Sequence, residues 1–597
     1  MSLLAALLHA GWIRNVDHAL GASMRHARDD TPDWVQSAAA LASRALAHGH
    51  SRVPLSRLPE LFAEIDPARD PPGLPPLEDW LALLSASPWV QAGSGFSRDK
   101  SAPGRILILE GDAISLRRYW NYECRLADAL MARMDASDSD PTSDAFAHGT
   151  SDAIAHGTSD AVAHEAHATN VQRLRLVTGG PGTGKTTQVA HVLIEFAARA
   201  AGTPPRILLA APTGKAASRL SESVRESLAA LVRDGRVDAA IAALLPTEAS
   251  TLHRLLGWQH DGGFRYDNDN PLPADLVVVD EASMVDLPMM TRLVEAVPAA
   301  ATLVLVGDRD QLPSVETGDV LAALCDASEL AGSPLAAHRL HLRTSHRQAA
   351  DIDVAQLAEL VRQGDADAVV RGLESARFRG ARWRQAGDRA LHDAVLADAL
   401  PHYLALRRQP DVASALRASR GYRVLCAVRE GAAGSITLNA ALGRALDPQG
   451  AGEGLFKGRL VLITENSYRQ QLFNGDIGIA WPDENDELRV WFDSDAGPRA
   501  WLPAALPAHE AAFALTVHKS QGSEFDQVFL ALPERGARVL SRELLYTGLT
   551  RCRREVLLWA SQDALREAVG RRAQRWSGLV DRLSMGWRGS DAQFNRS

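Results

Sequence analysis

The chain has 597 residues, of which 46% are hydrophobic and 23% are charged. This length exceeds what one hydrophobic core supports and the composition is ordinary for globular proteins, so we expect three or four domains and exclude fibrous and disordered classes. The net charge of −9 argues against a nucleic-acid coat protein but leaves room for a local basic groove.

No apolar segment approaches the length needed to span a bilayer, and no basic residue precedes the N-terminal apolar run. We therefore expect a cytoplasmic protein with no membrane segment. The four cysteines, Cys124, Cys325, Cys426 and Cys552, are far apart in the chain, which fits neither a CxxC metal site nor a disulfide-rich scaffold. They are expected to be buried, reduced thiols.

Residues 1–115 read as a mostly helical N-terminal domain with proline-rich breaks that finishes in a strand-like RILILEG. A linker over 116–170 follows, and it contains three copies of an eight-residue unit, SDAFAHGT, SDAIAHGT and SDAVAHEA, at 143–166. The recurring histidines raise the alternative of a metal-binding tract. Their spacing matches neither i,i+3 nor i,i+4, so an expanded linker is the favoured interpretation.

From Arg173 onward short apolar strands alternate with helices, which predicts an α/β fold with parallel sheets covered on both faces. RLRLVTG, RILLAAPT, DLVVVDEAS and TLVLVGD form a first set over 171–348. YRVLCAV, ALTVHKSQG, QVFLALP and EVLLWAS form a second set over 349–430 and 512–597. Residues 431–511 carry period-two strands with an Asn-Gly turn, which predicts a small inserted β-barrel.

Lysine is scarce in this chain. Only five of the 64 basic residues are lysines, namely Lys100, Lys185, Lys215, Lys457 and Lys519. Three of the five fall in glycine-bearing turns that follow apolar strands: GPGTGKTT, APTGKAAS and VHKSQGSE. A compact ammonium differs from a planar guanidinium in how it donates hydrogen bonds, so these turns are candidate sites.

The segment from Gly179 to Thr186 fits the phosphate-loop pattern G-x-x-x-x-G-K-[ST] between a strand and a helix. Its glycines free backbone N–H groups to surround a phosphate at a helix N-terminus. Lys185 is placed to reach the β and γ phosphate oxygens, and the Thr186 hydroxyl to bind Mg²⁺. The sequence therefore predicts a nucleotide triphosphate site.

Two further strand ends carry polar side chains. In VVVDEASMVD, Asp280 can hold Mg²⁺ and Glu281 can orient or deprotonate an attacking water. In VLVGDRDQLPSV, Asp308 and Gln311 are placed to sense the γ-phosphate. After a phosphate loop in an α/β domain, the acidic pair is a strong signal.

The order of these motifs resembles superfamily 1 helicases of the 5′-to-3′ class, and within them the RecD family, the α subunit of exodeoxyribonuclease V. APTGKAASRL, TLHRLLGW, RTSHRQ, LFNGDIGIAW, LTVHKSQGSEFDQV and LLYTGLTRCRRE complete the set between about 173 and 561. The resemblance implies two RecA-like motor domains with ATP and Mg²⁺ bound between them.

The resemblance also implies residue roles. The expected catalytic residues are Lys185, Glu281, Gln311, Arg347 and Arg551, with both arginines closing on the γ-phosphate from the second domain. The expected nucleotide contacts are Gly179, Gly180, Pro181, Gly182, Thr183, Gly184, Lys185, Thr186 and Thr187, with Thr186 and Asp280 as metal ligands. The expected DNA contacts are Thr213, Lys215, His253, Thr516 and His518.

Three features depart from this pattern or leave alternatives open. An adenine-reading glutamine is expected upstream of the phosphate loop, where only Gln172 stands, close to the strand. Residues 257–275 are predicted to form a β-hairpin, either a strand-separating pin or an exposed hairpin without a role. In the insertion, Tyr468, Phe473 and Trp481 could stack on bases or fill their own core, and core filling is favoured for Phe473.

The resulting prediction is a 5′-to-3′ DNA helicase or translocase that acts on single-stranded DNA and duplex ends in double-strand break repair and recombination. The family implies a hetero-oligomer with RecB-like nuclease-helicase and RecC-like scaffold subunits, with the N-terminal domain at 1–115 as the expected partner-docking domain. A self-sufficient helicase is the alternative, and an ATP-binding clamp that does not move is a rival from another class. The segment 514–530 is predicted to couple hydrolysis to DNA movement.

Overall fold

A computed structural model describes residues 2–66, 69–92, 105–137, 172–199, 204–259, 263–343, 353–450, 452, 454–467, 469–494, 497–534 and 539–584. Three predictions from the sequence lie outside these residues: the octapeptide repeat at 143–166, the candidate catalytic Arg347 and the candidate stacking residue Tyr468.

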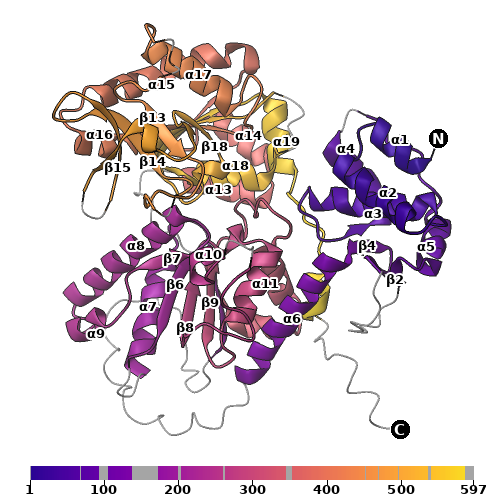
Figure 1. The fold of residues 1–597 in the computed structure, drawn as a ribbon. Coiled ribbons are helices and arrows are strands. Elements are labelled where there is room, and N and C mark those ends of the chain that lie inside the picture. The colour runs from indigo at the N-terminus through magenta and orange to yellow at the C-terminus, as the bar shows by residue number, and fades with distance from the viewer. Residues whose placement is uncertain are drawn as a thin grey trace.

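The N-terminal domain is helical with one small sheet, and it stands beside the rest of the molecule (Figure 1). Its helices are α1 (Leu3–His9), α2 (Asn15–Ala27), α3 (Asp33–Leu46), α4 (Leu58–Ile65) and α5 (Leu77–Ala86). Its strands, in the order β1-β4-β3-β2, are β1 (Val53–Pro54), β4 (Ala113–Leu116), β3 (Leu107–Glu110) and β2 (Val90–Ala92). Of these strands, only β3 is predicted from the sequence, where it forms part of the apolar run RILILEG.

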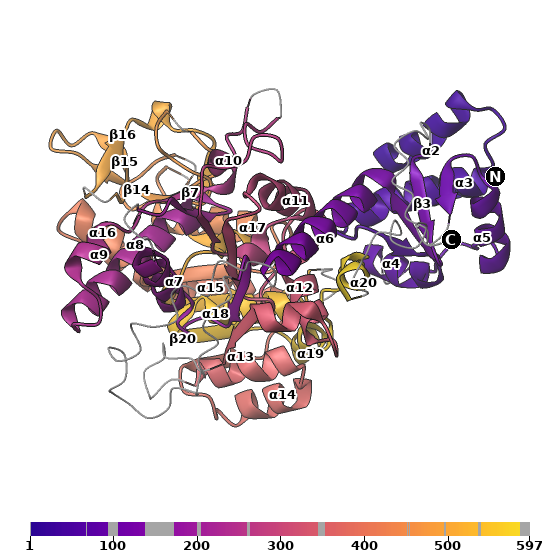
Figure 2. The same cartoon turned by 90° about the horizontal axis from the view of Figure 1, so that it is seen from below.

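A long helix, α6 (Arg117–Ser137), leads from this domain to the next one (Figures 1 and 2). Leu126 and Leu130 on α6 are fully buried in the core of the first parallel sheet. The short C-terminal helix α20 (Leu579–Ser584) packs beside α6, and its Leu579 and Leu583 enter the same core. The first part of the segment predicted as a linker is thus a helix fixed to the first motor domain.

The first parallel sheet has the strand order β10-β5-β9-β8-β6-β7. Its strands are β5 (Leu174–Gly179), β6 (Ile207–Ala211), β7 (Ala249–Thr251), β8 (Leu276–Val279), β9 (Thr302–Gly307) and β10 (Arg339–Leu342). Its helices are α7 (Lys185–Arg199), α8 (Gly214–Arg233), α9 (Ala239–Ala243), α10 (Leu252–Leu255), α11 (Leu287–Ala296) and α12 (Val320–Glu329). Side chains alternate between the two faces, so Val277 and Val278 lie in separate cores, as expected of a sheet covered on both faces.

The second parallel sheet has the order β11-β20-β19-β12-β18. Its strands are β11 (Ala381–Arg384), β12 (Tyr422–Cys426), β18 (Ala514–Thr516), β19 (Phe525–Ala531) and β20 (Cys552–Trp559). Its helices are α13 (Val354–Gln363), α14 (Ala366–Glu374), α15 (Leu391–Arg407), α16 (Val412–Ser419), α17 (Ser435–Leu446), α18 (Arg542–Thr550) and α19 (Gln562–Gly570). The expected α/β fold with two parallel-sheet domains is confirmed.

The insertion between β12 and β18 is an antiparallel sheet in the order β16-β15-β14-β13-β17. Its strands are β13 (Leu460–Ile463), β14 (Ile477–Pro482), β15 (Leu488–Phe492), β16 (Arg499–Trp501) and β17 (His509–Ala511). Among the described residues the terminal strands β16 and β17 do not pair with each other, so a closed barrel is not established. The predicted Asn-Gly turn is present, because Asp476 N–H donates to the Phe473 carbonyl at 3.0 Å and Gly475 has a φ of 98°.

Two remaining predictions concern thiols and membrane segments. Cys325, Cys426 and Cys552 are buried and Cys124 is partly buried, and all are free thiols. Burial raises the pKa of each thiol to about 12, so these side chains stay protonated and unreactive. Within the described ranges, no helix combines the length and apolar character needed to cross a bilayer.

Candidate active site

The phosphate loop lies between the end of β5 and the start of α7. Gly182 and Gly184 have φ angles of 74° and 86°, which side chains disfavour. A Cβ on Gly179 would lie 2.6 Å from Thr183 Oγ1, so the loop is too tight for any other residue there. Lys185 Nζ donates to the carbonyl oxygens of Gly179 and Gly180 at 2.7 and 2.9 Å, which places its charge inside the loop. This cradle, at the N-terminus of a 15-residue helix, fits a nucleotide phosphate chain.

Asp280 and Glu281 follow β8, which is separated from β5 by β9 alone. Burial raises the pKa of Asp280, and the neighbouring Glu281 carboxylate acts in the same direction. Glu281 has a φ of 52°, an uncommon backbone conformation for a glutamate, and its N–H donates to Asp280 Oδ1 at 2.8 Å. This arrangement holds two carboxyl groups side by side. With the Thr186 hydroxyl on α7, the Asp280 carboxylate supplies the oxygen ligands that Mg²⁺ prefers.

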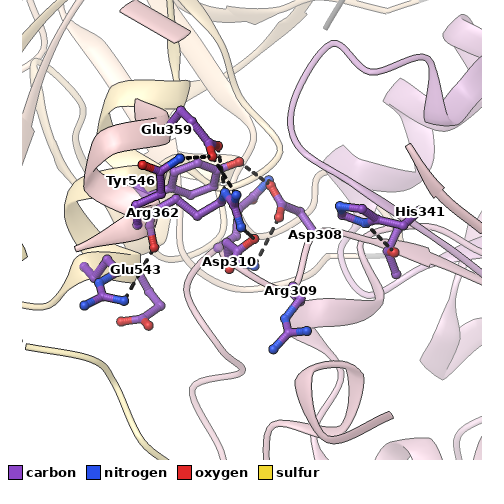
Figure 3. A network of polar contacts seen from close by, with 12 residues as sticks. Asp308, Arg309, Asp310, His341, Glu359, Arg362, Glu543 and Tyr546 are labelled. Atoms are coloured by element: carbon purple, nitrogen blue, oxygen red, sulfur yellow. Dashed lines mark hydrogen bonds and ion pairs between the residues drawn. The ribbon is translucent and has the colours of Figure 1, made fainter. Parts of the chain in front are cut away.

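The loop after β9 meets helix α18 of the second sheet. Gln311 Nε2 donates to Asp308 Oδ2 at 3.1 Å, and the Tyr546 hydroxyl donates to the same oxygen at 3.0 Å. Figure 3 shows Tyr546 pointing toward Asp308, and Arg362 lying between Asp310 and Glu359 in the same network. Burial raises the pKa of the Tyr546 hydroxyl well above its usual value, and Asp308 adds to this, so Tyr546 remains a donor. The third predicted motif is therefore bound directly to the other domain.

Arg551 lies one residue beyond α18 and is 3% exposed. Its Nη2 donates to Gln311 Oε1 at 2.8 Å and its Nε to the Thr547 carbonyl at 3.2 Å. Thr547 Oγ1 in turn accepts from Leu312 N–H at 2.9 Å. Two residues expected to meet the γ-phosphate, Gln311 and Arg551, are thus brought into contact from opposite domains.

The candidate coupling segment reaches the same loop. Gln521 Nε2 donates to the Leu312 carbonyl at 3.3 Å, and Gly522, with a φ of 70°, makes the turn. Thr516 Oγ1 accepts from the Lys519 N–H at 3.3 Å and so caps the turn over His518–Ser520. Lys519 Nζ lies 2.6 Å from Glu510 Oε1 on β17, which joins this turn to the inserted sheet.

The other expected DNA contacts gather at helix starts in the first domain. Thr213 caps α8 by accepting from Ala216 N–H at 3.2 Å, and Lys215 follows in the first turn. Burial lowers the pKa of Lys215 to about 8, with nearby arginines acting in the same direction. His253 lies on α10 and is exposed; its ring lies 6.0 Å from the Phe264 ring, and partial desolvation of the ring lowers its pKa. A neutral His253 contacts a phosphate only as a hydrogen-bond donor.

The insertion contributes aromatic side chains in two different ways. Trp481 is 5% exposed and belongs to the core of the second domain, so it fills a core. Phe473 does not belong to the core of the inserted sheet. It lies against Gly214 at the start of α8, where a Cβ would meet Phe473 Cβ at 2.5 Å. The expectation that Phe473 fills its own core is wrong, because the turn that carries it packs across the domain boundary.

Two open points concern Gln172 and the hairpin. Gln172 Nε2 donates to the Ala337 carbonyl at 2.9 Å, so its amide is bound to the first domain itself. Within the described part of 257–275, one antiparallel bridge joins Trp258 to Phe264. Trp258 is 46% exposed. The segment has the start of a hairpin, and its function stays a prediction.

Sequence reasoning missed Tyr546, Thr547 and Arg219 as members of this site. A signal was present for two of them, since Thr547 stands four residues before Arg551 and therefore on the same helical face. Arg219 stands four residues after Lys215 on α8 by the same rule. Their partners, however, lie on segments far away in the chain.

A phosphate loop, an acidic pair on a nearby strand and a buried arginine from a second parallel sheet define a P-loop nucleotide hydrolase with two motor domains. Family models match three parts of the chain. An AAA domain matches 161–317, a UvrD-like helicase C-terminal domain matches 511–559, and the N-terminal domain of RecBCD enzyme subunit RecD matches 9–112.

The chain belongs to the RecD family. It is 37% identical over 565 residues to RecBCD enzyme subunit RecD of Mycobacterium tuberculosis, which covers 93% of this chain and 92% of the relative. The subunit of the same name from Mycolicibacterium smegmatis is 39% identical over 579 residues, covering 93% of this chain and 94% of the relative. The ATP-dependent RecD2 DNA helicase of Deinococcus radiodurans is 34% identical, and the match covers 69% of this chain and 50% of that protein.

Among solved structures, two coordinating Pif1 helicases at forked duplex DNA align over 65% of this chain and 88% of theirs, with 19% identity and a TM-score of 0.35. A likeness at this level adds nothing about function.

Proposed function

We propose that this chain is an ATP-dependent DNA helicase that moves 5′ to 3′ along single-stranded DNA. One observation carries the proposal: the loop after β9 in the first domain is bound to the second domain at several points. They include Gln311 to Arg551 at 2.8 Å, Leu312 to Thr547 at 2.9 Å and Leu312 to Gln521 at 3.3 Å. Gln311 is expected to contact the γ-phosphate, and Gln521 belongs to the segment expected to hold DNA. A movement of the loop when the γ-phosphate is lost is therefore transmitted to the DNA-holding segment. The likeness to the ATP-dependent RecD2 DNA helicase of Deinococcus radiodurans supports this activity.

The proposed cycle uses the side chains described above. The Lys185 ammonium holds the phosphate chain within the glycine loop, and Glu281 orients and deprotonates the attacking water. Asp280 and Thr186 would hold Mg²⁺, which neutralises charge on the phosphate oxygens when bound. Arg551 supplies positive charge from the second domain, and Arg347 is proposed to add a second arginine. Closing and opening of the two domains then moves the strand held by Thr213, Lys215, His253, Thr516 and His518.

The direction of movement can be tested on partial duplexes with one single-stranded tail. The chain should displace the short strand from a 5′-tailed duplex in the presence of ATP and Mg²⁺, and not from a 3′-tailed duplex. Glu281→Gln removes the water-activating carboxylate at equal size and should abolish strand displacement while ATP still binds. Unwinding of the 3′-tailed duplex alone would refute the proposed direction.

The proposed setting is a RecBCD-type helicase-nuclease that acts on duplex ends in double-strand break repair and recombination. The two mycobacterial relatives are named as RecBCD subunits, which supports RecB-like and RecC-like partners. In the parts of the chain that the structure describes, no three His, Cys, Asp or Glu side chains are grouped to hold a metal, so we assign DNA cleavage to a partner. Affinity purification of the tagged chain from its native cell should recover both partners. Recovery of the chain alone would favour the self-sufficient helicase.

The rival of a non-moving ATP-binding clamp is disfavoured by two side chains. A binding module needs neither a carboxylate placed to activate water nor a buried arginine held against the γ-phosphate sensor, yet Glu281 and Arg551 are both present.

The predicted domain boundaries at 115, 170, 348, 430 and 511 and a cytoplasmic location are part of the same proposal.

A further inference from the structure

Helix α8 carries an arginine that leaves the first domain and binds a glutamate of the second. Arg219 Nη2 forms an ion pair with Glu524 Oε1. The Glu524 side chain is 5% exposed and that of Arg219 is 32% exposed, so the contact is largely shielded from water. Shielding from water strengthens such a pair and makes either charge unfavourable without the other. Neither residue belongs to the phosphate loop or to the expected DNA contacts.

Glu524 has a second partner that provides a comparison. Arg553 Nε lies 3.1 Å from Glu524 Oε2, and the Arg553 side chain is 54% exposed. Arg553 stands on β20 of the same domain as Glu524, so this second pair does not cross between domains. Of these two ion pairs, the one with Arg219 is the one that crosses to the first domain.

Arg219 also interacts electrostatically with the expected catalytic carboxylates. Burial lowers the pKa of Arg219, but the pair with Glu524 outweighs it and raises the pKa, and Glu281 and Asp280 act in the same direction as Glu524. Burial lowers the pKa of Arg551, with Arg219 acting in the same direction and Glu281 and Glu524 opposing it. The guanidinium of Arg219 is therefore bound directly to the segment that is expected to hold DNA, and it interacts electrostatically with the carboxylate expected to activate water.

The first turn of α8 links this pair to the strand-binding surface. Thr213 and Lys215 begin the helix, and a Cβ on Gly522 would lie 3.8 Å from Ala216 Cβ, so the turn of the coupling segment rests on that first turn. Arg219 follows one helical turn after Lys215 on the same face. A shift of α8 would therefore act on the coupling segment at both Gly522 and Glu524.

We propose that Arg219 is a positioning residue: through its ion pair with Glu524 it holds the coupling segment against α8, so that strand binding at the start of α8 sets the rate of hydrolysis. This inference rests on the proposed helicase function. It assigns to Arg219 no contact with DNA or nucleotide, and it separates Arg219 from Arg553, which shares the same carboxylate.

The test compares Arg219→Gln, Glu524→Gln, the double variant and Arg553→Gln in the full-length chain. Each preparation is assayed for affinity toward a single-stranded oligonucleotide, for ATP turnover with and without it, and for base pairs unwound per ATP. We expect Arg219→Gln and Glu524→Gln each to lower the stimulation by DNA about fivefold, and the double variant to be no worse than either single one. Oligonucleotide affinity should change less than twofold in Arg219→Gln, and Arg553→Gln should match wild type.

Several outcomes would overturn the inference while leaving the proposed function intact: wild-type stimulation in Arg219→Gln, an equal loss in Arg553→Gln, or losses that multiply in the double variant. A loss caused by unfolding is recognised by a lowered melting temperature. In that case Arg219→Lys separates loss of the ion pair from unfolding. It keeps a positive charge near Glu524 and should therefore recover part of the stimulation of ATP turnover by DNA. If wild-type protein fails to unwind any tailed duplex, the proposed function fails instead.

Discussion

Four of the five lysines lie in the described part of the chain, and each has a definite environment. Lys185 Nζ lies in the glycine cradle, and Lys215 is half-buried at the start of α8. Lys519 Nζ is 2.6 Å from Glu510, and Lys457 Nζ lies 4.3 Å from the centre of the Trp481 ring. The lysine-bearing turns that were chosen as candidate sites therefore do lie where separate segments contact each other. It could not identify their partners, which stand elsewhere in the chain.

For the rest of the site, too, the sequence placed the functional loops but not the residues that they contact. The loops that hold Lys185, Glu281 and Gln311 were predictable, because each follows a continuous apolar strand and the ends of parallel strands meet at one edge. The contact between Gln311 and Arg551 was not predictable in the same way, since it spans 240 residues and depends on how two separate sheets face each other.

Lys185→Ala should abolish ATP hydrolysis and unwinding while the fold remains. The loop conformation comes from its glycines, whereas the lysine contributes positive charge at the phosphates and two hydrogen bonds to loop carbonyls. ATP turnover and circular dichroism measure the two effects separately. Lys457→Ala is the matched control, since it removes a lysine that packs on Trp481, and it should keep turnover. Wild-type turnover in Lys185→Ala would refute the assignment of the loop.

The affinity for single-stranded DNA should fall as the pH rises from about 7 to about 9. The pKa of Lys215 is lowered to about 8 by burial, with Arg423, Arg420 and Arg219 acting in the same direction and Asp476 opposing them. The charged fraction of the free side chain therefore drops from roughly nine tenths to roughly one tenth over this range, and a neutral amine does not attract phosphate. Fluorescence anisotropy with a labelled oligonucleotide measures the slope. Lys215→Arg, which stays charged, should flatten it, and an equal slope in both proteins would exclude Lys215 as the cause.

At the scale of elements, the strands of the two motor domains were the most predictable part. All eight predicted strands are present as β5, β6, β8, β9, β12, β18, β19 and β20. The strands that were missed in these sheets, β7, β10 and β11, are three or four residues long and lie at the sheet edges. Edge strands bury less apolar surface than central strands. The sequences of β10 (RLHL) and β11 (ARWR) accordingly carry charged residues and no continuous apolar run. Strand order depends on helix packing and could not be read from the sequence.

The coupling segment can be tested by two sets of substitutions. Thr516→Ala with His518→Ala should weaken single-stranded DNA binding on the order of tenfold, because both expected strand contacts are lost, and should lower DNA-stimulated turnover with it. Basal hydrolysis should persist, since the phosphate loop and Glu281 are unchanged. Anisotropy and ATP turnover are measured on one preparation.

Gln521→Ala should give the complementary result. It removes the hydrogen bond from Nε2 to the Leu312 carbonyl and leaves Thr516 and His518 in place. We therefore expect nearly normal DNA binding but fewer base pairs unwound per ATP. If this variant and the double variant both unwind at the wild-type rate, the segment is a surface loop without a coupling role.

At the scale of the whole molecule, the C-terminal segment joins the N-terminal domain to the motor. Trp576 is 7% exposed within the N-terminal core, its ring lies 4.2 Å from that of His50, and its carbonyl accepts from Ser51 N–H at 2.9 Å. Arg582 pairs with Glu110 at 2.8 Å and with Glu123 on α6 at 3.5 Å. Arg582 thus serves internal contacts that join the C-terminal segment to the N-terminal domain and to α6.

A truncation that starts at Arg117 should keep DNA-stimulated ATP turnover and lose assembly with RecB-like and RecC-like partners. The catalytic loops lie outside the deleted part, whereas the N-terminal domain is the expected docking surface. The melting temperature should fall, because Trp576 loses its core and Glu123 loses the Ser51 hydroxyl. Thermal melting, turnover and co-purification test the three claims, and undiminished assembly would contradict the docking role.

The position of Trp576 also has a consequence during synthesis on the ribosome. Its carbonyl accepts from the Ser51 hydroxyl, a residue 525 positions earlier, so the N-terminal core stays open until residue 576 has been made. At about 5–20 residues per second, that interval lasts roughly 25 to 105 s. During this time, the apolar surface that Trp576 later covers is available to chaperones, and a segment made after both motor domains completes the N-terminal domain.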